Sequence, residues 1–274
     1  MANAEPRLLI LGAHPDDAEY HAGGLATIYR MLGRDVKIVS VTDGAAGHHE
    51  RSPAELRVLR REEAAAAGRV IGATYETWDF PDAALQPTLD VRYRIIREIR
   101  RFKPDLVLTH RTSDYHPDHR AVGQSVQDAS YLVKVPHVLP DVPALQKDPV
   151  VAYMPDLFTK PVRMQPDVII DVTEYMDRIV EMLACHRSQV FEWLAHAEGI
   201  LETVPADTSD RLIWLRSWFS RHVRPRADHF RKELVAAYGQ ASDQSIEFIE
   251  AFEISEYAYR PDTDLLRRLF PAHH

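Results

Sequence analysis

The stretch LLILGAHPDD, residues 8–17, combines an apolar run with a cluster of polar side chains at its end. Its first four residues are typical of a parallel strand that is covered on both faces. A small Gly-Ala pair allows a tight turn, and His14, Asp16 and Asp17 follow it. In open α/β sheets, ligands bind beyond the carboxyl ends of the strands. The stretch therefore predicts an α/β sheet with a functional site at this strand end.

The residue types in this cluster suit metal binding and acid–base chemistry. Histidine nitrogens and carboxylate oxygens are zinc ligands, and a second aspartate could remain free as a base. A different interpretation is that Asp16 or Asp17 only caps the helix that follows, because aspartate is a preferred N-cap residue. The motif taken alone leaves both interpretations open.

A second cluster of similar composition follows another apolar run. Residues 105–110 (DLVLTH) predict a buried strand, and DYHPDHR at 114–120 comes after it. Clusters at the ends of two strands in one sheet can converge on a single metal ion. Two histidines, one carboxylate and an open position are a known ligand set for catalytic zinc. The two clusters together favour a metal site over a helix cap.

The motifs His14-Pro15-Asp16-Asp17 and His116-Pro117-Asp118-His119 resemble those of the zinc-dependent N-acetylglucosaminyl deacetylases of the LmbE-like, or PIG-L, family. The resemblance extends from about residue 7 to residue 189, with a fainter match at 250–252. It implies an α/β fold of the LmbE-like type, a Rossmann-like three-layer sandwich with a mostly parallel sheet.

The resemblance also implies a ligand set and a cofactor. One zinc ion would be held by His14, Asp17 and His119, with a water molecule at the open position. Fe²⁺ or Co²⁺ would suit the same ligands, because ligand type alone does not select strongly among these metals.

The same resemblance assigns catalytic roles. Asp16 would be the general base, and His116, if protonated, would stand beside the oxyanion and protonate the leaving amine. Asp118 would orient His116 and keep it cationic. Arg60 matches the first arginine of the family's Arg-x-Glu-Glu-Ala helix and would face the substrate. An ordinary charged helix surface is the alternative for Arg60.

Composition limits the class of partner and the compartment. The chain has 274 residues, 33 Lys and Arg against 41 Asp and Glu, and a net charge of −8. This charge argues against nucleic acid or an anionic membrane as the main partner. The single cysteine, Cys185, excludes an internal disulfide and fits a reducing compartment, so we expect a cytoplasmic protein without a signal peptide. We find no apolar run long enough for a membrane span.

Length and periodicity predict one domain, residues 1–274. The segment 198–240 is helical and polar and carries no family motif, so we expect an insertion or an oligomer contact there. The loops 45–52 and 135–148 are expected near the site, the second over its mouth. We expect strands at 36–41, 75–80, 150–154, 168–172 and 246–254, and helices at 25–32, 53–71, 89–102, 120–133 and 173–197.

The leading hypothesis is a metal-dependent deacetylase acting on an N-acetylated amino sugar or its conjugate, and the family resemblance implies a homo-oligomer, trimer or hexamer. Two alternatives stay open. One is a zinc amidase for another acyl amide or a thiol conjugate, and the other is a non-catalytic sugar- or metal-binding protein. Asp16 and His116 argue against the second alternative, because a binding protein needs neither a free base nor an acid. We expect His21 to be a packed or surface histidine and not a third ligand. We expect His110 to be a packed, hydrogen-bonded histidine, and the alternative is a residue that supports the metal ligands.

Overall fold

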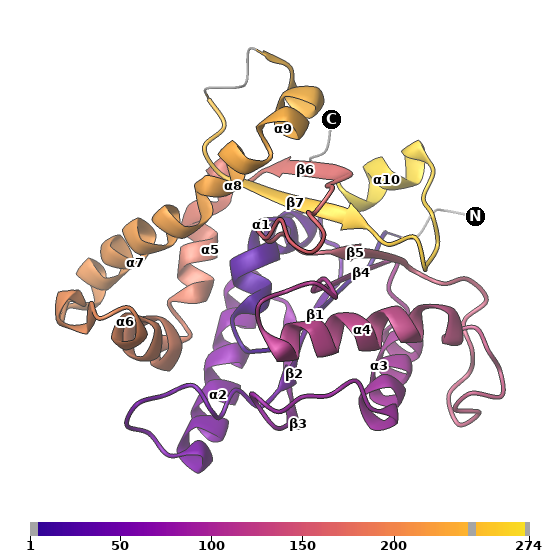
Figure 1. Cartoon of the computed structure of the whole chain (residues 1–274), viewed down its shortest axis with the longest axis horizontal. Coiled ribbons are helices and arrows are strands. Elements are labelled where there is room, and N and C mark those ends of the chain that lie inside the picture. The colour runs from indigo at the N-terminus through magenta and orange to yellow at the C-terminus, as the bar shows by residue number, and fades with distance from the viewer. Residues whose placement is uncertain (1–4, 241–244, 272–274) are drawn as a thin grey trace.

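The computed structural model describes residues 5–240 and 245–271, and its seven described strands form one sheet between two layers of helices (Figure 1). The strand order is β3-β2-β1-β4-β5-β7-β6. The first five strands are parallel, and β7 runs antiparallel to both β5 and β6. The strands are β1 (Leu8–Gly12), β2 (Val36–Thr42), β3 (Thr74–Phe80), β4 (Leu106–Thr109), β5 (Val150–Tyr153), β6 (Val168–Asp171) and β7 (Ile249–Ile254).

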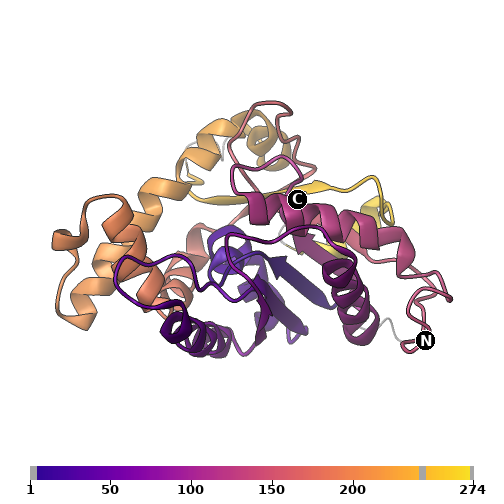
Figure 2. The same cartoon turned by 60° about the horizontal axis from the view of Figure 1, so that its bottom comes forward.

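Helices cover both faces of the sheet, which confirms the three-layer α/β fold expected from the sequence. One layer contains α3 (Leu89–Phe102) and α4 (Pro117–Leu132), and the other contains α1 (Asp17–Met31), α2 (Pro53–Ile71) and α5 (Met176–Leu183). In both views α7 lies beside α5, on the side away from α3 (Figures 1 and 2). The remaining helices are α6 (Leu194–Ala197), α7 (Thr208–Val223), α8 (Pro225–His229), α9 (Arg231–Tyr238) and α10 (Thr263–Leu269), with short turns η1 (Thr173–Tyr175), η2 (Ser188–Trp193) and η3 (Leu201–Thr203).

The apolar run at the start of the chain forms the centre of the core. Leu8 and Ile10 pack against the layer of α1, whereas Leu9 and Leu11 pack against the layer of α3 and α4. All four side chains are fully buried. Each contributes about 1.5–3 kcal/mol of hydrophobic stabilisation. Burial on both faces explains why the run shows no alternation of polar and apolar residues.

Helix α1 consists of two segments that meet at Ala22, whose backbone (φ −146°) is not helical. The second segment begins at Gly24 and Leu25, and Glu250 of β7 accepts hydrogen bonds from both of their N–H groups, at 2.7 and 2.9 Å. A Cβ atom on Gly24 would lie 2.3 Å from a methyl carbon of Val172. Glycine is therefore required for the close approach of α1 to this part of the fold.

Local sequence signals give α2 correctly. Pro53–Ile71 is helical, Ser52 caps it, and Glu55 completes the capping box. The single helix expected at 173–197 is wrong, because the segment is divided into α5, the π-helical η2 and α6. Residues of α2 cause this interruption: Glu63 accepts hydrogen bonds from the backbone N–H and the hydroxyl of Ser188.

The expectation that residues 135–148 cover the site is also wrong. These residues connect the end of α4 to the start of β5, at the edge opposite the carboxyl ends of the strands. Arg100 holds the segment there by donating hydrogen bonds to the carbonyls of Val135, Val138 and Val142. In the part of the chain that the structure describes, no helix is long and apolar enough to cross a membrane.

Candidate functional site

The two sequence clusters meet at the carboxyl ends of β1 and β4. His14 follows β1, Asp17 begins α1, and His119 lies in the first turn of α4. His14 Nδ1 lies 3.3 Å from His119 Nε2 and 3.6 Å from Asp17 Oδ2, and His119 Nε2 lies 3.4 Å from Asp17 Oδ1. Zinc bonds of about 2.1 Å in a tetrahedron place ligand atoms about 3.4 Å apart. The three side chains therefore have the spacing of a metal ligand set.

The position of Asp17 depends on the glycine at the end of β1. A Cβ atom on Gly12 would lie 2.9 Å from Asp17 Cβ, closer than side chains tolerate. Asp17 accepts a hydrogen bond from the backbone N–H of His14 at 2.7 Å. Its Oδ2 also lies 3.0 Å from His110 Nε2. Despite burial, the charges and hydrogen bonds of His119 and His110 hold the pKa of Asp17 well below its usual value, so the carboxylate is ionised.

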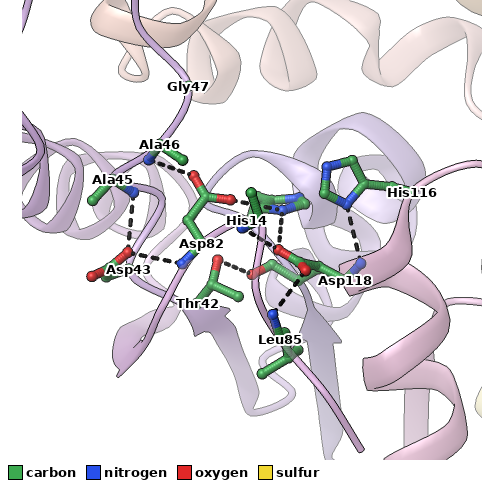
Figure 3. A network of polar contacts seen from close by, with 12 residues as sticks. His14, Thr42, Asp43, Ala45, Ala46, Gly47, Asp82, Leu85, His116 and Asp118 are labelled. Atoms are coloured by element: carbon green, nitrogen blue, oxygen red, sulfur yellow. Dashed lines mark hydrogen bonds and ion pairs between the residues drawn. The ribbon is translucent and has the colours of Figure 1, made fainter.

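In both histidines of this set, a carboxylate lies close to the ring nitrogen that faces away from the candidate metal position. His14 Nε2 lies 3.2 Å from Asp82 and 3.2 Å from Asp118 (Figure 3), and His119 Nδ1 lies 3.0 Å from Asp114. Burial disfavours charge on His119, but Asp17 and Asp114 outweigh it and raise its pKa to about 9. A carboxylate on the second ring nitrogen fixes the orientation of a metal-binding histidine and strengthens it as a ligand.

Sequence reasoning did not assign a role to Asp82 or Asp114. Asp82 follows β3 in the segment Phe80-Pro81-Asp82, and Asp114 opens the second cluster. The sequence feature that could have identified both residues is the same as in the two motifs, a carboxylate just beyond the end of a strand. Asp82 came from a third strand and had no histidine beside it in the sequence, so only the folded chain brings it to His14.

The expected contact between Asp118 and His116 is wrong. The carboxylate of Asp118 accepts hydrogen bonds from the backbone N–H groups of Ala83 (2.7 Å) and Leu85 (3.0 Å), and it contacts His14. In Figure 3 it points toward the loop after β3 and away from the His116 ring. Asp118 thus orients His14, because its side chain is bound by that loop.

His116 occupies the N-cap position of α4, where its Nδ1 accepts a hydrogen bond from the backbone N–H of Asp118 at 3.2 Å. The accepting nitrogen carries no proton, so the ring is neutral with its proton on Nε2. Burial and the neighbouring His14 and His119 lower the pKa of His116. The cationic His116 expected from the sequence is therefore disfavoured. His116 also offers an atom within 4.8 Å of those of His14 and His119, which makes it an alternative ligand.

Asp16 has an unusual backbone for a residue with a side chain. Its φ of 124° lies in a region that residues other than glycine rarely adopt, and such strain is often retained at functional sites. The residue is 9% exposed and lines the site cavity. Burial and the negative charge of Asp17 raise the pKa of Asp16 to about 7. A carboxyl group with this pKa can both accept and release a proton near neutral pH.

Arg60 does not line the cavity, and it acts on the site through neighbours. Its Nη2 donates hydrogen bonds to the carbonyl of Gly47, at 2.7 Å, and to the amide oxygen of Gln189. Gln189 is on the cavity wall. The side chain of Arg60 is fully enclosed, with 2% exposed. The arginine therefore holds Gln189 and the 45–52 loop in place, which differs from the substrate contact expected from the sequence.

The two other histidines singled out in the sequence are packed, as expected, but both lie near the candidate ligands. The His110 ring stacks on His119 with 3.9 Å between ring centroids. The His21 ring lies edge-on to His110 with 6.0 Å between centroids. His21 and His119 are both on the wall of the site cavity.

A cavity of about 360 Å³ opens in front of this cluster. His14, Asp16, Asp17 and His119 line one part of it, and residues 155–158 after β5 line another. Trp218, His222 and Arg226 line it from α7 and α8. Part of the segment 198–240, expected to be an insertion or an oligomer contact, thus forms a wall of the site. In the sequence, only the spacing of four residues between Trp218, His222 and Arg226 indicates that they share one face of a helix. An ordinary solvent-exposed helix face has the same spacing, so the sequence does not identify a cavity wall.

Comparison with known proteins agrees with this arrangement. Residues 9–130 match the family model PIG-L, described as GlcNAc-PI de-N-acetylase. This part of the chain therefore resembles a PIG-L (LmbE-like) domain. The matched residues extend from β1 through most of α4 and include both motifs of the PIG-L resemblance.

Relatives with known or assigned activities fall into two reaction classes. The chain is 26% identical over 201 residues to 4-oxalmesaconate hydratase of Pseudomonas putida, and the alignment covers 70% of this chain and 78% of the relative. It is 24% identical over 233 residues to a probable N-acetyl-alpha-D-glucosaminyl L-malate deacetylase 2 of Bacillus subtilis, with coverage of 79% and 95%. The structure superposes on N,N'-diacetylchitobiose deacetylase of Pyrococcus horikoshii with a TM-score of 0.70, at 21% identity and coverage of 95% and 88%, so the two share the PIG-L fold.

Proposed function

We propose that this protein is a metal-dependent hydrolase that removes the acetyl group from an N-acetylated amino sugar or its conjugate. The mutual distances of 3.3–3.6 Å among His14, Asp17 and His119, beside a strained Asp16, carry this proposal. The deacetylases among the similar proteins support the reaction class.

The metal would be held by His14 Nδ1, His119 Nε2 and the Asp17 carboxylate, and zinc, Fe²⁺ or Co²⁺ all suit this set. The carboxylates behind both imidazoles support the assignment, since metal-binding histidines almost always have such partners. When bound, the metal would polarise the acetamide carbonyl and lower the pKa of water.

The protein side chains would move protons and stabilise charge. Asp16 would accept a proton from the attacking water as the new C–O bond forms. It would then give this proton to the nitrogen as the C–N bond breaks, so that acetate and an amine are released. Nε2–H of His116 would donate a hydrogen bond to the negatively charged oxygen that develops between these steps. A single carboxyl group with a pKa of about 7 suits both proton transfers.

A hydratase is the second candidate, because the chain is 26% identical to one. Addition of water to a carbon–carbon double bond also needs a base for water, and Asp16 would serve. The two reactions differ in their products: hydration releases no amine, whereas hydrolysis of an amide releases one amine and one acid. A zinc amidase for a larger acyl group would release an acid other than acetate.

The deciding experiment is a screen of free and conjugated N-acetylated amino sugars with the protein loaded in turn with zinc, Fe²⁺ and Co²⁺. Amine release and acetate are measured in parallel, and metal-stripped protein is the control. We expect both products in equal amounts. An acid other than acetate would identify the amidase, and water addition to an unsaturated acid without any amine release would identify the hydratase.

Two finer expectations belong to the same proposal. A trimer or hexamer is expected in solution, which light scattering would show as a multiple of three of the 31.3 kDa chain. A cytoplasmic location is expected from the single cysteine.

A further inference from the structure

Arg226 of α8 is a buried cation without a carboxylate partner. Its side chain is 4% exposed, and no carboxylate in the described residues forms an ion pair with it. The guanidinium donates a hydrogen bond to the backbone carbonyl of Tyr20 at 3.1 Å and lies over the Tyr20 ring at 5.3 Å. These contacts with neutral groups only partly offset the cost of removing a full charge from water. Binding of an anion would supply the missing negative charge, so a buried arginine with these contacts is a candidate anion-binding residue.

His21 adds a second donor beside Arg226. Arg226 Nη2 lies 3.3 Å from His21 Nδ1, and since arginine only donates, Nδ1 is the acceptor. The proton of the neutral His21 ring is therefore on Nε2. Burial and the nearby Arg226 charge also hold the pKa of His21 well below its usual value. Both residues line the same cavity as Asp16 and Asp17.

Glu198 and Asp156, two further carboxylates that line the cavity, are already paired. Glu198 accepts a hydrogen bond from Trp218 Nε1 at 3.0 Å and contacts His222 Nε2 at 3.1 Å. Asp156 forms an ion pair with Arg111 at 3.0 Å. Neither of them contacts Arg226. The charge of Glu250 acts on Arg226 from β7, but the oxygens of Glu250 accept hydrogen bonds from the N–H groups of Gly24 and Leu25. Among the described residues, Arg226 therefore has no carboxylate in direct contact.

We propose that Arg226 and His21 form a subsite for a carboxylate group of the substrate. A carboxylate fits better than a phosphate, because the planar guanidinium matches two oxygens and, among the described residues, no second cation contacts the subsite to balance a double charge. The inference rests on the proposed function and narrows it: the substrate is an N-acetylated amino sugar whose ring or attached group carries a carboxylate.

The subsite can be tested without turnover. Succinate is titrated into metal-free protein by calorimetry, using wild type, R226Q, R226K and R221Q. Arg221 is an exposed residue of α7 that contacts Ser217 and is the matched control. We expect binding to wild type and R221Q, binding weakened about tenfold or more in R226Q, and an intermediate value in R226K. Equal binding by wild type and R226Q, or no binding by wild type, would overturn the subsite. Tighter binding of inorganic phosphate than of succinate would overturn the assignment to a carboxylate.

A matched pair of substrates separates this inference from the proposed function. Metal-loaded wild type is given an N-acetylglucosaminide with a carboxylate on its attached group, and the methyl ester of the same compound. We expect kcat/KM to be about tenfold or more higher for the acid, and this ratio to collapse in R226Q. Equal rates for acid and ester would refute the subsite and leave deacetylation standing. If neither compound releases an amine, deacetylation of such sugars fails, and the succinate titration still decides the subsite. Because the acid–ester ratio is measured on wild type, it holds even if R226Q folds poorly.

Discussion

At the scale of single residues, the two ring nitrogens of His14 have different partners. Nδ1 faces the candidate metal position, whereas Nε2 faces Asp82 and Asp118. The sequence motif predicted that His14 binds metal, and it did not predict which nitrogen does so or which residue orients the ring. Asp118 was expected beside His116 because the two are close in sequence. Its backbone hydrogen bonds to the loop after β3 direct it to His14 instead.

Replacing Asp118 by Asn tests this orientation. We expect metal affinity to fall about 10–100-fold, because the amide is a weaker partner for the His14 ring than a carboxylate. Competition with a chromophoric chelator gives the affinity. Asp128→Asn, on the same helix and paired with Arg92, is the control and should bind metal as wild type does. The contact with His116 expected from the sequence would be supported by a different result. In that case Asp118→Asn would bind metal with unchanged affinity, and the fall of kcat/KM at high pH would begin at a lower pH than in wild type.

Replacing Asp16 by Asn tests the base. Asparagine tolerates a positive φ better than most residues, so the strained backbone should survive the change. We expect metal content and thermal stability close to those of wild type, and a rate lower by about 10²–10⁴-fold. Metal analysis and steady-state kinetics on the same preparation provide both values. If the metal is lost together with the activity, Asp16 is a ligand or a structural residue.

At the scale of elements, local signals predicted those helices that are defined by their own residues. Ser52, Pro53 and Glu55 fix the start of α2 in the sequence itself. The break between α5 and α6 has no such local signal, since it follows from Glu63 of α2 binding Ser188. The kink of α1 at Ala22 likewise depends on Glu250, more than 220 residues away in the chain.

The close approach of α1 to Val172 predicts different costs for two adjacent glycines. Gly24→Ala would place Cβ 2.3 Å from Val172 Cγ1, whereas Gly23→Ala would place it 3.3 Å from Ile179. We expect Gly24→Ala to lower the free energy of unfolding by about 1–3 kcal/mol, as for other overpacked core positions, and Gly23→Ala to lower it less. Urea denaturation of both variants measures the difference. Equal effects would show that α1 can move away from Val172 at little cost.

The carboxyl group that caps the second segment of α1 predicts a pH dependence of stability. Burial raises the pKa of Glu250 to about 7, although the N–H groups of Leu25 and Gly24 and the charge of Arg226 oppose the shift. Above its unfolded pKa of about 4.3, the unfolded state releases a proton that the folded state keeps. This contribution is therefore complete below about pH 4.3 and is lost as the pH rises through 7, with a slope of at most about 1.4 kcal/mol per pH unit.

Glu250→Gln should remove this part of the pH dependence, because the amide does not titrate. Thermal or urea unfolding of wild type and variant at several values between pH 5 and 8 measures the difference in slope. The stability of wild type should fall more steeply with rising pH than that of the variant. Parallel curves would mean that Glu250 is already ionised throughout this range in the folded protein.

At the scale of the whole molecule, the site is assembled from segments that the sequence separates widely. The meeting of His14, Asp17 and His119 was predictable because each motif is contiguous and follows a strand end. Asp82, Gln189 and Arg226 reach the cavity or its ligands from a loop, from η2 and from α8. Each stands alone among ordinary polar residues in the sequence, so only tertiary packing shows its place. For the same reason, the sequence did not predict that α7 and α8 form a wall of the cavity.

The position of β7 in the sheet has a consequence for synthesis of the chain on the ribosome. β7 lies between β5 and β6, yet it is the last of the described strands to be translated. Until it arrives, β5 has an unpaired edge, β6 has no neighbour in the sheet, and the N–H groups of Gly24 and Leu25 lack their acceptor. Unpaired edges invite pairing with other chains. The nascent chain therefore has all the candidate metal ligands before its sheet is complete, and a ribosome-associated chaperone would be most useful in the interval before β7 is translated.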